Sequence, residues 1–520
     1  MRTCMILLAA WCLVATASGE FADYVFVPPS KTETEALPRA VVEGWLAQAC
    51  PRFVFDTLAE QNDVLKSFHA GALPLCVAEG FSLELDEAAL FDQGLDDGDA
   101  QVFLAAVTSL DAIAVRLLVD LSALEAGDEL WVIAPDAARA FGPFTAADAV
   151  EGGRWLHTVF GDTAVLAVRT SYDTPPPLQL LGLSHFFVEP AKATLYPCPV
   201  EADCVSDTVF QEISTGIGML FIPYKGYKQA QCSGALLNNP DTPELEGLVL
   251  TADHCFSGGS VNTTGIEVLW DYRAAACNGS GVPDPNTVPR SVGSQLLARD
   301  DVYDGAFFSV QSVPVGARGR AWLGWDTRTP ALNDAIAGTH HPMGKPLKAC
   351  FGRVTKLDVS TFLGKNQTEV HWDEGITEQG SSGSPLMFSN LNYRVFGMLS
   401  NGPTHDCANP SQNRDNYSSF RSFFPRIQCH LLTGRECEDG NGSGGLCPAK
   451  AAFGDNEEAL AALRAFRDKA LAATPGGRRL IAAYYRHAPR MAALVNTSPR
   501  ARGLFLASAA PFVELGRMLR

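Results

Sequence analysis

Short apolar runs separated by turns rich in glycine, aspartate and asparagine make up most of this chain. In residues 20–192 such runs occupy 112–119, 129–133 and 163–169, and turn pairs such as Gly127-Asp128 separate them. Several short strands in succession favour a β-sandwich. A helical pattern near residues 40–49 is the exception in this region.

Residues 193–436 keep the strand pattern. Their apolar runs lie at 216–222, 234–237, 248–252, 266–270, 306–310, 353–359 and 394–399. Many short strands over this length predict a double β-barrel whose cleft carries the chemistry. A parallel α/β fold would need helices between the strands, and no helical periodicity is evident there. The predicted fold class is therefore mainly β.

The two ends of the chain differ from this middle. Arg2, an apolar run at 5–14 and an A-x-A site at 15–17 predict a secretory signal over residues 1–19. After a glycine-rich linker at 438–445, apolar residues recur at helical spacing from Asn456 onward. We expect four parts: the signal 1–19, an amino-terminal region 20–192, the barrel domain 193–436, and a linker with a small helical domain 437–520.

Composition and charge limit the classes of protein to which this chain can belong. With 47% apolar and 9% aromatic residues the 520-residue chain is globular. A net charge of −18 argues against nucleic acid as a partner, because a phosphate-binding surface must be basic. The signal run is too short to cross a bilayer and no other segment reaches about 18 uncharged apolar residues, so we expect no transmembrane segment. These features predict a secreted protein, extracellular or periplasmic.

Cysteine usage fits an oxidising compartment. Of 14 cysteines, Cys4 and Cys12 lie in the signal, and the even number that remains predicts disulfides. Cys50 and Cys76 are candidates for one bridge. No paired C-x-x-C spacing occurs, so we expect neither a metal site nor another cofactor.

Two stretches carry the candidate chemistry. The hexapeptide GSSGSP at 380–385 places Ser382 between glycines, which allows a sharp turn with a projecting hydroxyl. Earlier, TADHC at 251–255 places His254 after an apolar run and beside a cysteine. Histidine first and serine last, with a carboxylate between, is the order of the chymotrypsin-type triad. We interpret Ser382 as the nucleophile and His254 as its base.

The remaining site residues follow from neighbouring sequence. Candidates for the third triad member are Asp300, Asp301 and Asp304. We choose Asp304 because it directly precedes an apolar strand, whereas the other two lie beside Arg299 in what looks like a solvated turn. The N–H groups of Gly380 and Ser382 would form the oxyanion hole. Ser400, Asn401 and Gly402 follow an apolar strand and suit an edge that pairs with an extended substrate.

At these residues the region 193–436 resembles the bacterial lysyl endopeptidases, trypsin-like serine proteases that cleave after lysine. The shared stretches are TADHC, GSSGSP and GTHHP at 338–342. The resemblance implies a chymotrypsin-like double β-barrel. It also implies the disulfides Cys198–Cys407, Cys204–Cys277 and Cys232–Cys255. The extra cysteines would then pair as Cys350–Cys429 and Cys437–Cys447. Read as a family motif, His340-His341-Pro342 is a packing feature and not a metal site.

The same resemblance implies how lysine is selected and how the chain matures. Asp415, in the stretch NRDNY at 413–417, looks like the family's specificity aspartate, although the stretch is one residue tighter. Position 376, where trypsin carries its own specificity aspartate, is isoleucine. Ser381 replaces the aspartate that pairs with a new amino terminus in trypsin. Residues 20–192 look like the family's propeptide, and Lys192 is the expected processing site.

The tail is similar to the CFI-box carboxy-terminal domain of bacterial surface and secreted proteins, with LCPAKAAFG at 446–454 in the place of that box. The leading hypothesis is a secreted serine endopeptidase zymogen, expected to be a monomer, that acts on proteins or peptides after lysine and binds its own proregion. Two alternatives stay open. One is a trypsin-like protease of another specificity, and the other is a non-catalytic protease-like binding protein.

Overall fold

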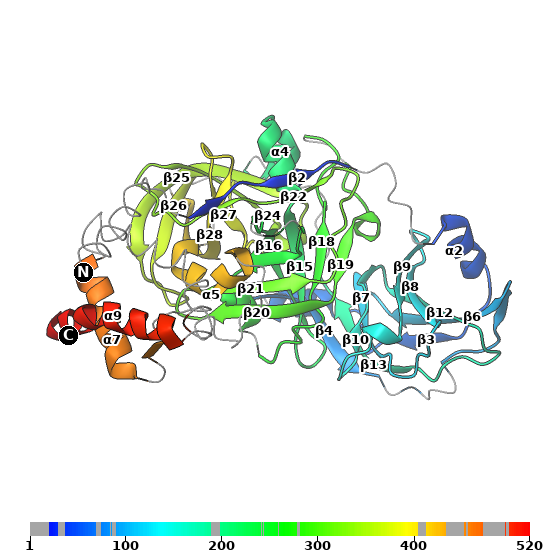
Figure 1. Cartoon of the computed structure of the whole chain (residues 1–520). Coiled ribbons are helices and arrows are strands. Elements are labelled where there is room, and N and C mark those ends of the chain that lie inside the picture. The colour runs from blue at the N-terminus through cyan, green and yellow to red at the C-terminus, as the bar shows by residue number, and fades with distance from the viewer. Residues whose placement is uncertain are drawn as a thin grey trace.

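A computed structural model of the chain (Figure 1) describes residues 20–519 with several gaps. The gaps are 30–36, 69–73, 84, 86–89, 189–197, 241, 243, 258, 278–280, 404–411, 433–451, 454–455, 472–494 and 496–498. The expected signal, the linker 438–445, Lys192, Cys407, Cys437 and Cys447 lie outside the described residues. So does most of the stretch similar to a CFI box.

The amino-terminal region is a β-sandwich. One sheet has the order β3-β6-β12-β8-β9 with β5 beside β6. Its strands are β3 (Arg52–Phe55), β5 (Leu95–Asp97), β6 (Ala100–Ser109), β8 (Glu129–Ala134), β9 (Arg139–Phe144) and β12 (Thr163–Thr170). The facing strands are β4 (Leu75–Ser82), β7 (Ala114–Asp120), β10 (Arg154–Trp155), β11 (Val159–Phe160) and β13 (Gln179–Phe186).

Apolar side chains fill both faces of the first sheet. Val107, Val132 and Leu166 pack against Leu117 and Leu183 of the facing strands. On the outer face helix α2 (Arg39–Leu46) covers the sheet, and its Val42 and Trp45 contact Val102 and Trp131. A second short helix, α3, spans Asn62–Phe68. The apolar runs at 129–133 and 163–169 therefore correspond to strands of a sheet that is buried between two layers.

Residues from 200 onward form two barrels. In the first, β16 pairs with β15 and β17, β15 with β18, β18 with β19, β17 with β21 and β21 with β20. Its strands are β15 (Ile217–Pro223), β16 (Gln229–Leu236), β17 (Leu248–Thr251), β18 (Glu267–Trp270), β19 (Arg290–Val292), β20 (Ser294–Asp300) and β21 (Gly305–Val310). Only Gly293 separates β19 from β20, so the sheet curls around a core that includes Leu220, Val249, Val268 and Phe308.

The second barrel is a closed ring. The order β28-β27-β24-β25-β26-β29 is completed by pairing of β29 with β28. Its strands are β24 (Ala335–His340), β25 (Lys348–Val359), β26 (Gln367–Glu374), β27 (Pro385–Phe388), β28 (Arg394–Asn401) and β29 (Arg414–Ser419). Its core includes Ile336, Val354, Trp372, Leu386 and Tyr417. The predicted mainly β fold with a double barrel is confirmed.

Helices precede the first barrel, follow the second barrel and make up the described part of the tail. Helix α4 (Thr208–Ser214) begins at Asp207, whose carboxylate accepts the Val209 and Phe210 N–H groups. Sequence reasoning missed α5 (Phe420–Leu432), although its buried positions 420, 423, 424, 427 and 431 have helical spacing. In the tail, α7 (Glu457–Phe466), a π-helical segment (Arg467–Leu471) and α9 (Pro499–Leu519) are described, and α7 packs on α9. No described helix is long and apolar enough to cross a membrane.

Free and bonded cysteines correct two expected pairings. Cys204–Cys277 and Cys232–Cys255 are disulfides, and Cys198 and Cys429 are also disulfide-bonded. Cys50 and Cys76 are free, because Cys50 precedes a strand of one sandwich sheet whereas Cys76 lies within β4 of the other. Cys350 is a free thiol buried in the second barrel, so it does not pair with Cys429.

Strand pairing crosses the expected boundary between the amino-terminal region and the barrels. Strand β4 adds to β16, so five sandwich strands continue into the first barrel as one sheet. Strands β1 (Phe21–Ala22) and β2 (Val25–Val27) pair with β23 (Trp325–Asp326) and β22 (Arg320–Trp322) of the barrel domain. In Figure 1 the sandwich lies to one side of the barrels, and β4 lies between them.

A buried charge cluster centred on Glu267 joins the two parts. Its carboxylate lies 3.6 Å from Arg116, 3.0 Å from His157 Nδ1 and 3.3 Å from Arg290, and it accepts the Thr158 N–H at 3.1 Å. Burial alone would raise the pKa of Glu267, but Arg116, the His157 hydrogen bond and Arg290 lower it. A buried carboxylate surrounded by donors in this way is stable only while they stay in place.

We predict that Glu267→Gln lowers the free energy of unfolding by about 3–5 kcal/mol, because two buried guanidinium groups lose their countercharge. Urea unfolding measures the loss. The matched control is Glu43→Gln in the exposed Arg39–Glu43 pair, where we expect about 0–1 kcal/mol. Equal losses in the two variants would contradict a structural role for the cluster.

Candidate active site

His254 lies where the first barrel faces the second. Strand β17 ends at Thr251, and the short 3-10 helix Asp253–Phe256 follows, with His254 buried in it. The Cys232–Cys255 disulfide fixes this helix to β16. The neighbouring Asp253 forms an ion pair with Arg299 at 2.6 Å. The imidazole is therefore held on a rigid element.

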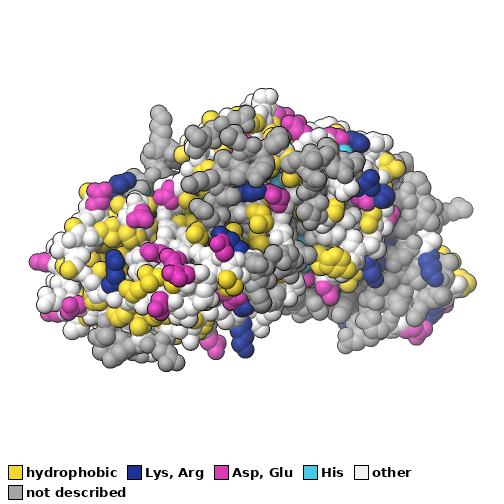
Figure 2. Space-filling model, turned by 180° about the vertical axis from the view of Figure 1, so that it is seen from behind, with side chains coloured by type: hydrophobic (Ala, Val, Ile, Leu, Met, Phe, Trp, Pro, Cys, Tyr) yellow, Lys and Arg dark blue, Asp and Glu magenta, His cyan; other side chains and the backbone are white. Residues whose placement is uncertain are grey.

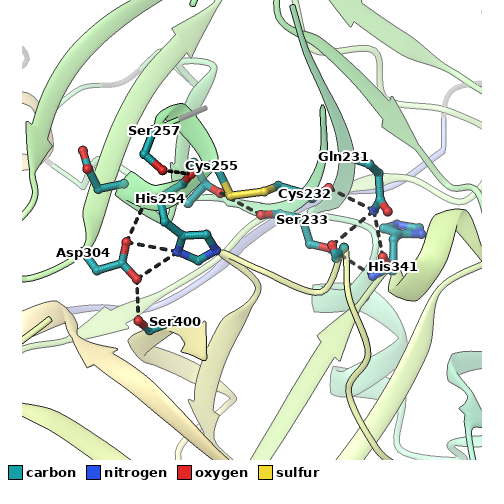
Figure 3. The surroundings of a disulfide bond; sticks show 12 residues. Gln231, Cys232, Ser233, His254, Cys255, Ser257, Asp304, His341 and Ser400 are labelled. Carbon is teal, nitrogen blue, oxygen red and sulfur yellow. Dashed lines mark hydrogen bonds and ion pairs between the residues drawn. A yellow bond between two sulfur atoms is a disulfide. The ribbon is translucent and has the colours of Figure 1, made fainter. Parts of the chain in front are cut away.

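Asp304 orients the imidazole (Figure 3). Its carboxylate oxygens lie 3.1 and 3.0 Å from His254 Nδ1, and one of them also accepts the His254 backbone N–H at 2.8 Å. A carboxylate can only accept, so Nδ1 carries the proton and Nε2 is left as an acceptor. Figure 3 shows Nε2 turned away from Asp304. Among the described residues this buried nitrogen has no hydrogen-bond partner.

The other two candidate aspartates do not reach His254. Asp300 is buried and bonds Arg426 at 2.9 Å, so the expectation that it lies in a solvated turn is wrong, whereas Asp301 is exposed. Asp304 directly precedes β21, as expected, and adopts a left-handed φ of 45°. A left-handed non-glycine residue is strained, and it persists where surrounding contacts fix it.

Ser400 has a contact that sequence reasoning missed. It was expected only as part of a substrate-binding edge, but its hydroxyl donates to the Asp304 carboxylate. Gln367 in turn donates to the Ser400 hydroxyl at 2.8 Å. Both residues lie on the second barrel, so they fix the Asp304 carboxylate from the side opposite His254. Nothing in their local sequence distinguishes them from other polar strand residues.

The elbow at 380–384 is tightly packed against the first barrel. Gly380 and Gly383 have φ values of 84° and 79°. A methyl group at Gly383 would lie 2.0 Å from Thr251 Oγ1, and one at Gly380 would lie 2.0 Å from Gln231. The Ser233 N–H also donates to Ser382 O at 2.8 Å. Only glycine combines this backbone conformation with this close approach.

The backbone donors of the elbow fall into two groups. The N–H groups of Ser381, Gly383 and Ser384 donate to backbone carbonyl oxygens at 2.8–3.1 Å. The N–H groups of Gly380 and Ser382, proposed for the oxyanion hole, have no acceptor among the described residues. Two unpaired donors on one tight turn are the arrangement that stabilises a developing oxyanion.

Ser382 is nearly buried and lies close in the fold to His254. Its neighbour Gly383 contacts Thr251 and Ala252, the residues just before the histidine helix. The structure forms no hydrogen bond between Ser382 Oγ and His254 Nε2. In proteases without substrate this bond is often long and tightens only in the complex. The structure therefore brings the segments that carry the two residues together without a hydrogen bond between their side chains.

Asp415 belongs to the second barrel. It is buried on β29, and one of its oxygens accepts the Trp372 indole N–H at 2.6 Å and the Thr377 hydroxyl at 2.7 Å. A methyl group at Gly402 would lie 1.9 Å from its other oxygen. Burial raises the pKa of the nearby Cys350 thiol, and the Asp415 carboxylate adds to this shift. Asn401 bonds Thr361 and Asn416 beside this edge.

The two histidines of the 338–342 stretch differ in their contacts. His340 Nδ1 lies 2.8 Å from the Ser381 hydroxyl, so it fixes the elbow next to Ser382. His341 stacks on Tyr272 and bonds Lys345 O at 3.1 Å. Burial lowers the pKa of His341 to about 4. No three histidine, cysteine, aspartate or glutamate side chains gather as metal ligands in the part of the chain that the structure describes.

Comparison with known proteins points to the same domain. Residues 196–418 match the family described as "Lysyl endopeptidase, C-terminal domain". A "Lysyl endopeptidase" of Pseudomonas aeruginosa is 28% identical over 242 residues, which cover 44% of this chain and 50% of that protein. The chain thus spans about half the length of this curated relative.

Solved structures show weaker likenesses. An "HtrA-type protease AlgW with tripeptide" is 13% identical over 44% of this chain and 64% of its own, with a TM-score of 0.31. The active form of the Rv3671c protease from M. tuberculosis is 14% identical over 48% of this chain and 96% of its own, also with a TM-score of 0.31.

The double barrel, with His254 and Asp304 on one barrel and the glycine elbow on the other, defines the class of trypsin-like serine protease folds. Within that class, residues 196–418 are similar to the C-terminal domain of lysyl endopeptidases.

His341 makes stability depend on pH. Its pKa is lowered in the fold from the ordinary 6.5 to about 4, so the folded state holds it neutral while the unfolded chain protonates below pH 6.5. Its contribution is complete above pH 6.5 and is lost as the pH falls toward 4. We predict that His341→Gln makes the decline in unfolding free energy with falling pH shallower over this range. The slope should decrease by at most the amount that corresponds to the binding of one proton on unfolding. Urea titrations at stepped pH measure this, and an unchanged slope would contradict it.

Proposed function

We propose that this chain is a serine endopeptidase that hydrolyses peptide bonds through an acyl-enzyme. The observation that carries the proposal is the pairing of Asp304 with His254 Nδ1. Among the described residues, this pairing leaves Nε2 without a hydrogen-bond partner, and two N–H groups of the nearby elbow have no acceptor. A base that is oriented by a carboxylate and a nearby serine with an oxyanion hole are the parts that acyl transfer requires.

Each residue has one role in the proposed reaction. Ser382 Oγ attacks the substrate carbonyl carbon while His254 Nε2 takes its proton, and Asp304 stabilises the imidazolium that forms. The N–H groups of Gly380 and Ser382 bind the oxyanion, and one such donor is worth about 3–4 kcal/mol. The imidazolium then protonates the leaving amine. Water attacks the acyl-enzyme with the same base and releases the acid.

A fluorophosphonate should label Ser382, because only an activated hydroxyl reacts with it. We predict that Ser382→Ala abolishes labelling and that Asp304→Asn lowers peptide turnover by about 10⁴-fold. Asp301→Asn is the control, since Asp301 is exposed in the same loop. Peptide mapping identifies the labelled residue. Labelling that persists in Ser382→Ala, or equal turnover in the two aspartate variants, would refute the assignment of these residues. Absence of labelling in the wild-type protein would favour a non-catalytic binding protein.

For specificity we propose cleavage on the carboxyl side of lysine, with Asp415 binding the substrate ammonium. Asp415 is buried, and two neutral donors, Trp372 and Thr377, hold one of its oxygens. A carboxylate held in this way forms a charge-assisted hydrogen bond with an ammonium that reaches it. Ser400, Asn401 and Gly402 would pair with the substrate backbone beside this site. The name of the Pseudomonas relative supports the lysine preference.

Replacing the pocket carboxylate tests this specificity. We predict that Asp415→Asn lowers kcat/KM for a lysyl ester by about 10- to 100-fold, as loss of a hydrogen bond to a charged group implies. A norleucyl ester, similar in shape but uncharged, should change little. Asp373→Asn is the control because this carboxylate is exposed and paired with Arg353. Equal losses on both esters would argue against Asp415 as the ammonium site.

We further propose that the protein is exported, acts on protein or peptide substrates as a monomer, and matures by cleavage at Lys192. The two disulfides formed within the barrel domain support an oxidising compartment. The face of the molecule in Figure 2 supports a partner other than nucleic acid, since basic side chains are scattered there and interspersed with acidic ones.

A further inference from the structure

The first residues of β16 form a strand edge that β4 covers. The two strands are antiparallel, and the paired residues are Gln229 with Ala78, Ala230 with Cys76, and Gln231 with Leu75. β4 belongs to the amino-terminal sandwich, so this pairing joins the expected proregion to the barrel directly.

This edge begins beside the elbow. The Gln231 side chain donates to Gly380 O at 3.1 Å, and the Ser233 N–H, two residues further along β16, donates to Ser382 O at 2.8 Å. The covered edge is therefore continuous with the backbone that touches the nucleophile. A chain bound there would extend directly out of the catalytic cleft.

The position of Asp415 decides which part of a substrate would use the edge. Asp415 and Gly402 lie on the second barrel, so the substrate residue before the cleaved bond lies on that side of Ser382. The segment after the bond must leave over the first barrel, where β16 is. β16 runs toward the elbow, so the antiparallel β4 runs away from it, in the direction of a leaving segment. Strand addition to an exposed edge is a common mode of peptide binding.

We propose that β4 occupies, in the intact chain, the strand edge that the leaving side of a protein substrate would use, so that the amino-terminal region inhibits by strand competition. The inference rests on the proposed protease function. It assigns residues 229–231 as a docking surface for an extended backbone and the chain's own β4 as the resident partner.

Side-chain contacts hold β4 in register. Tyr227, in the turn before β16, packs into a gap left by two glycines, and a methyl group at Gly182 would lie 2.1 Å from its ring. The Ser184 hydroxyl donates to Tyr227 O, and Lys228 pairs with Glu79 of β4 at 2.8 Å. The glycines are therefore a socket for Tyr227, and β4 fits this barrel by shape as well as by backbone pairing.

A shared core adds to these contacts. Val77 of β4 and Phe186 of β13 pack with Phe221 and Leu269 of the barrel. The buried Glu267 cluster joins the same two parts through Arg116. Cleavage of the chain at Lys192 breaks none of these contacts. We therefore expect that cleavage alone does not uncover the β16 edge.

The inhibition is steric, because the contacts that orient the elbow and the imidazole are already formed in the intact chain. The Ser381 hydroxyl bonds His340 at 2.8 Å, and Asp304 holds His254. The elbow is therefore ordered by His340 and does not need an ion pair with a new amino terminus. A small substrate with no residues after the cleaved bond does not need the β16 edge.

The test uses the full-length Lys192→Gln chain, which is expected to stay uncut, with two substrates. One is a lysyl ester with a small alcohol leaving group, and the other is a peptide with four residues after its lysine. We expect the uncut chain to hydrolyse the ester readily and the peptide poorly. Adding Gly182→Ala, which displaces the Tyr227 ring from its socket, should weaken the pairing of β4 with β16. We expect the ratio of peptide to ester kcat/KM to rise by about tenfold, equivalent to about 1.4 kcal/mol.

Two further variants control the result. Gly44→Ala in α2 meets no atom within 4 Å and should leave the ratio unchanged. Tyr227→Ala loosens the same contact from the barrel side and should reproduce the effect if Gly182→Ala fails to fold.

The outcomes separate the two hypotheses. A ratio that stays constant when Tyr227→Ala is folded overturns strand competition. So does an uncut chain that hydrolyses neither substrate while the loosened variants hydrolyse both, because the block would then lie in the catalytic parts. If no form, including wild type, hydrolyses the ester, the proposed protease function fails, and this inference fails with it.

Discussion

The buried carboxylate of Asp304 determines the geometry of the site. It accepts hydrogen bonds from the backbone and ring of His254 on the first barrel and from Ser400 on the second. A charge excluded from water is tolerated only when donors surround it, so each of these contacts constrains the others. The left-handed backbone of Asp304 is held by the same contacts. The junction of the two barrels therefore has one favoured arrangement, and the imidazole has one favoured orientation within it.

Much of the fold and part of the site could be predicted because their signals are local. Alternating apolar runs report strands directly, since successive side chains on a strand face opposite sides. The glycines beside Ser382 indicate a turn because a Cβ at Gly380 or Gly383 would collide with Gln231 or Thr251. Asp304 could be chosen over its neighbours because an apolar strand follows it. The choice of Asp415 rests on the family resemblance; in the structure its carboxylate is buried.

The features that could not be predicted depend on partners far away in the sequence. Ser400 and Gln367 are ordinary strand residues until the second barrel brings them to Asp304. The pairing of Cys50 with Cys76 was plausible by count alone, but Cys50 precedes a strand of one sheet and Cys76 lies on a strand of the other. Arg116 and Glu267 show no local sign of pairing, because each lies on a strand of a different part. Pairing between such groups depends on the tertiary fold, and no periodic pattern in the sequence indicates it.

The continuity of one sheet from sandwich to barrel has an energetic consequence. Separation of the two parts would expose Phe221 and Leu269 to water, and apolar surface contributes roughly 25 cal/mol per Å² when buried. It would also leave Glu267 without Arg116 while Arg290, on the barrel, remained beside it. The barrel could therefore keep a partly neutralised carboxylate, but the sandwich would lose the countercharge of a buried guanidinium. Separation penalises the amino-terminal region more than the barrel, so the region that leaves is the one left less stable and more open to digestion.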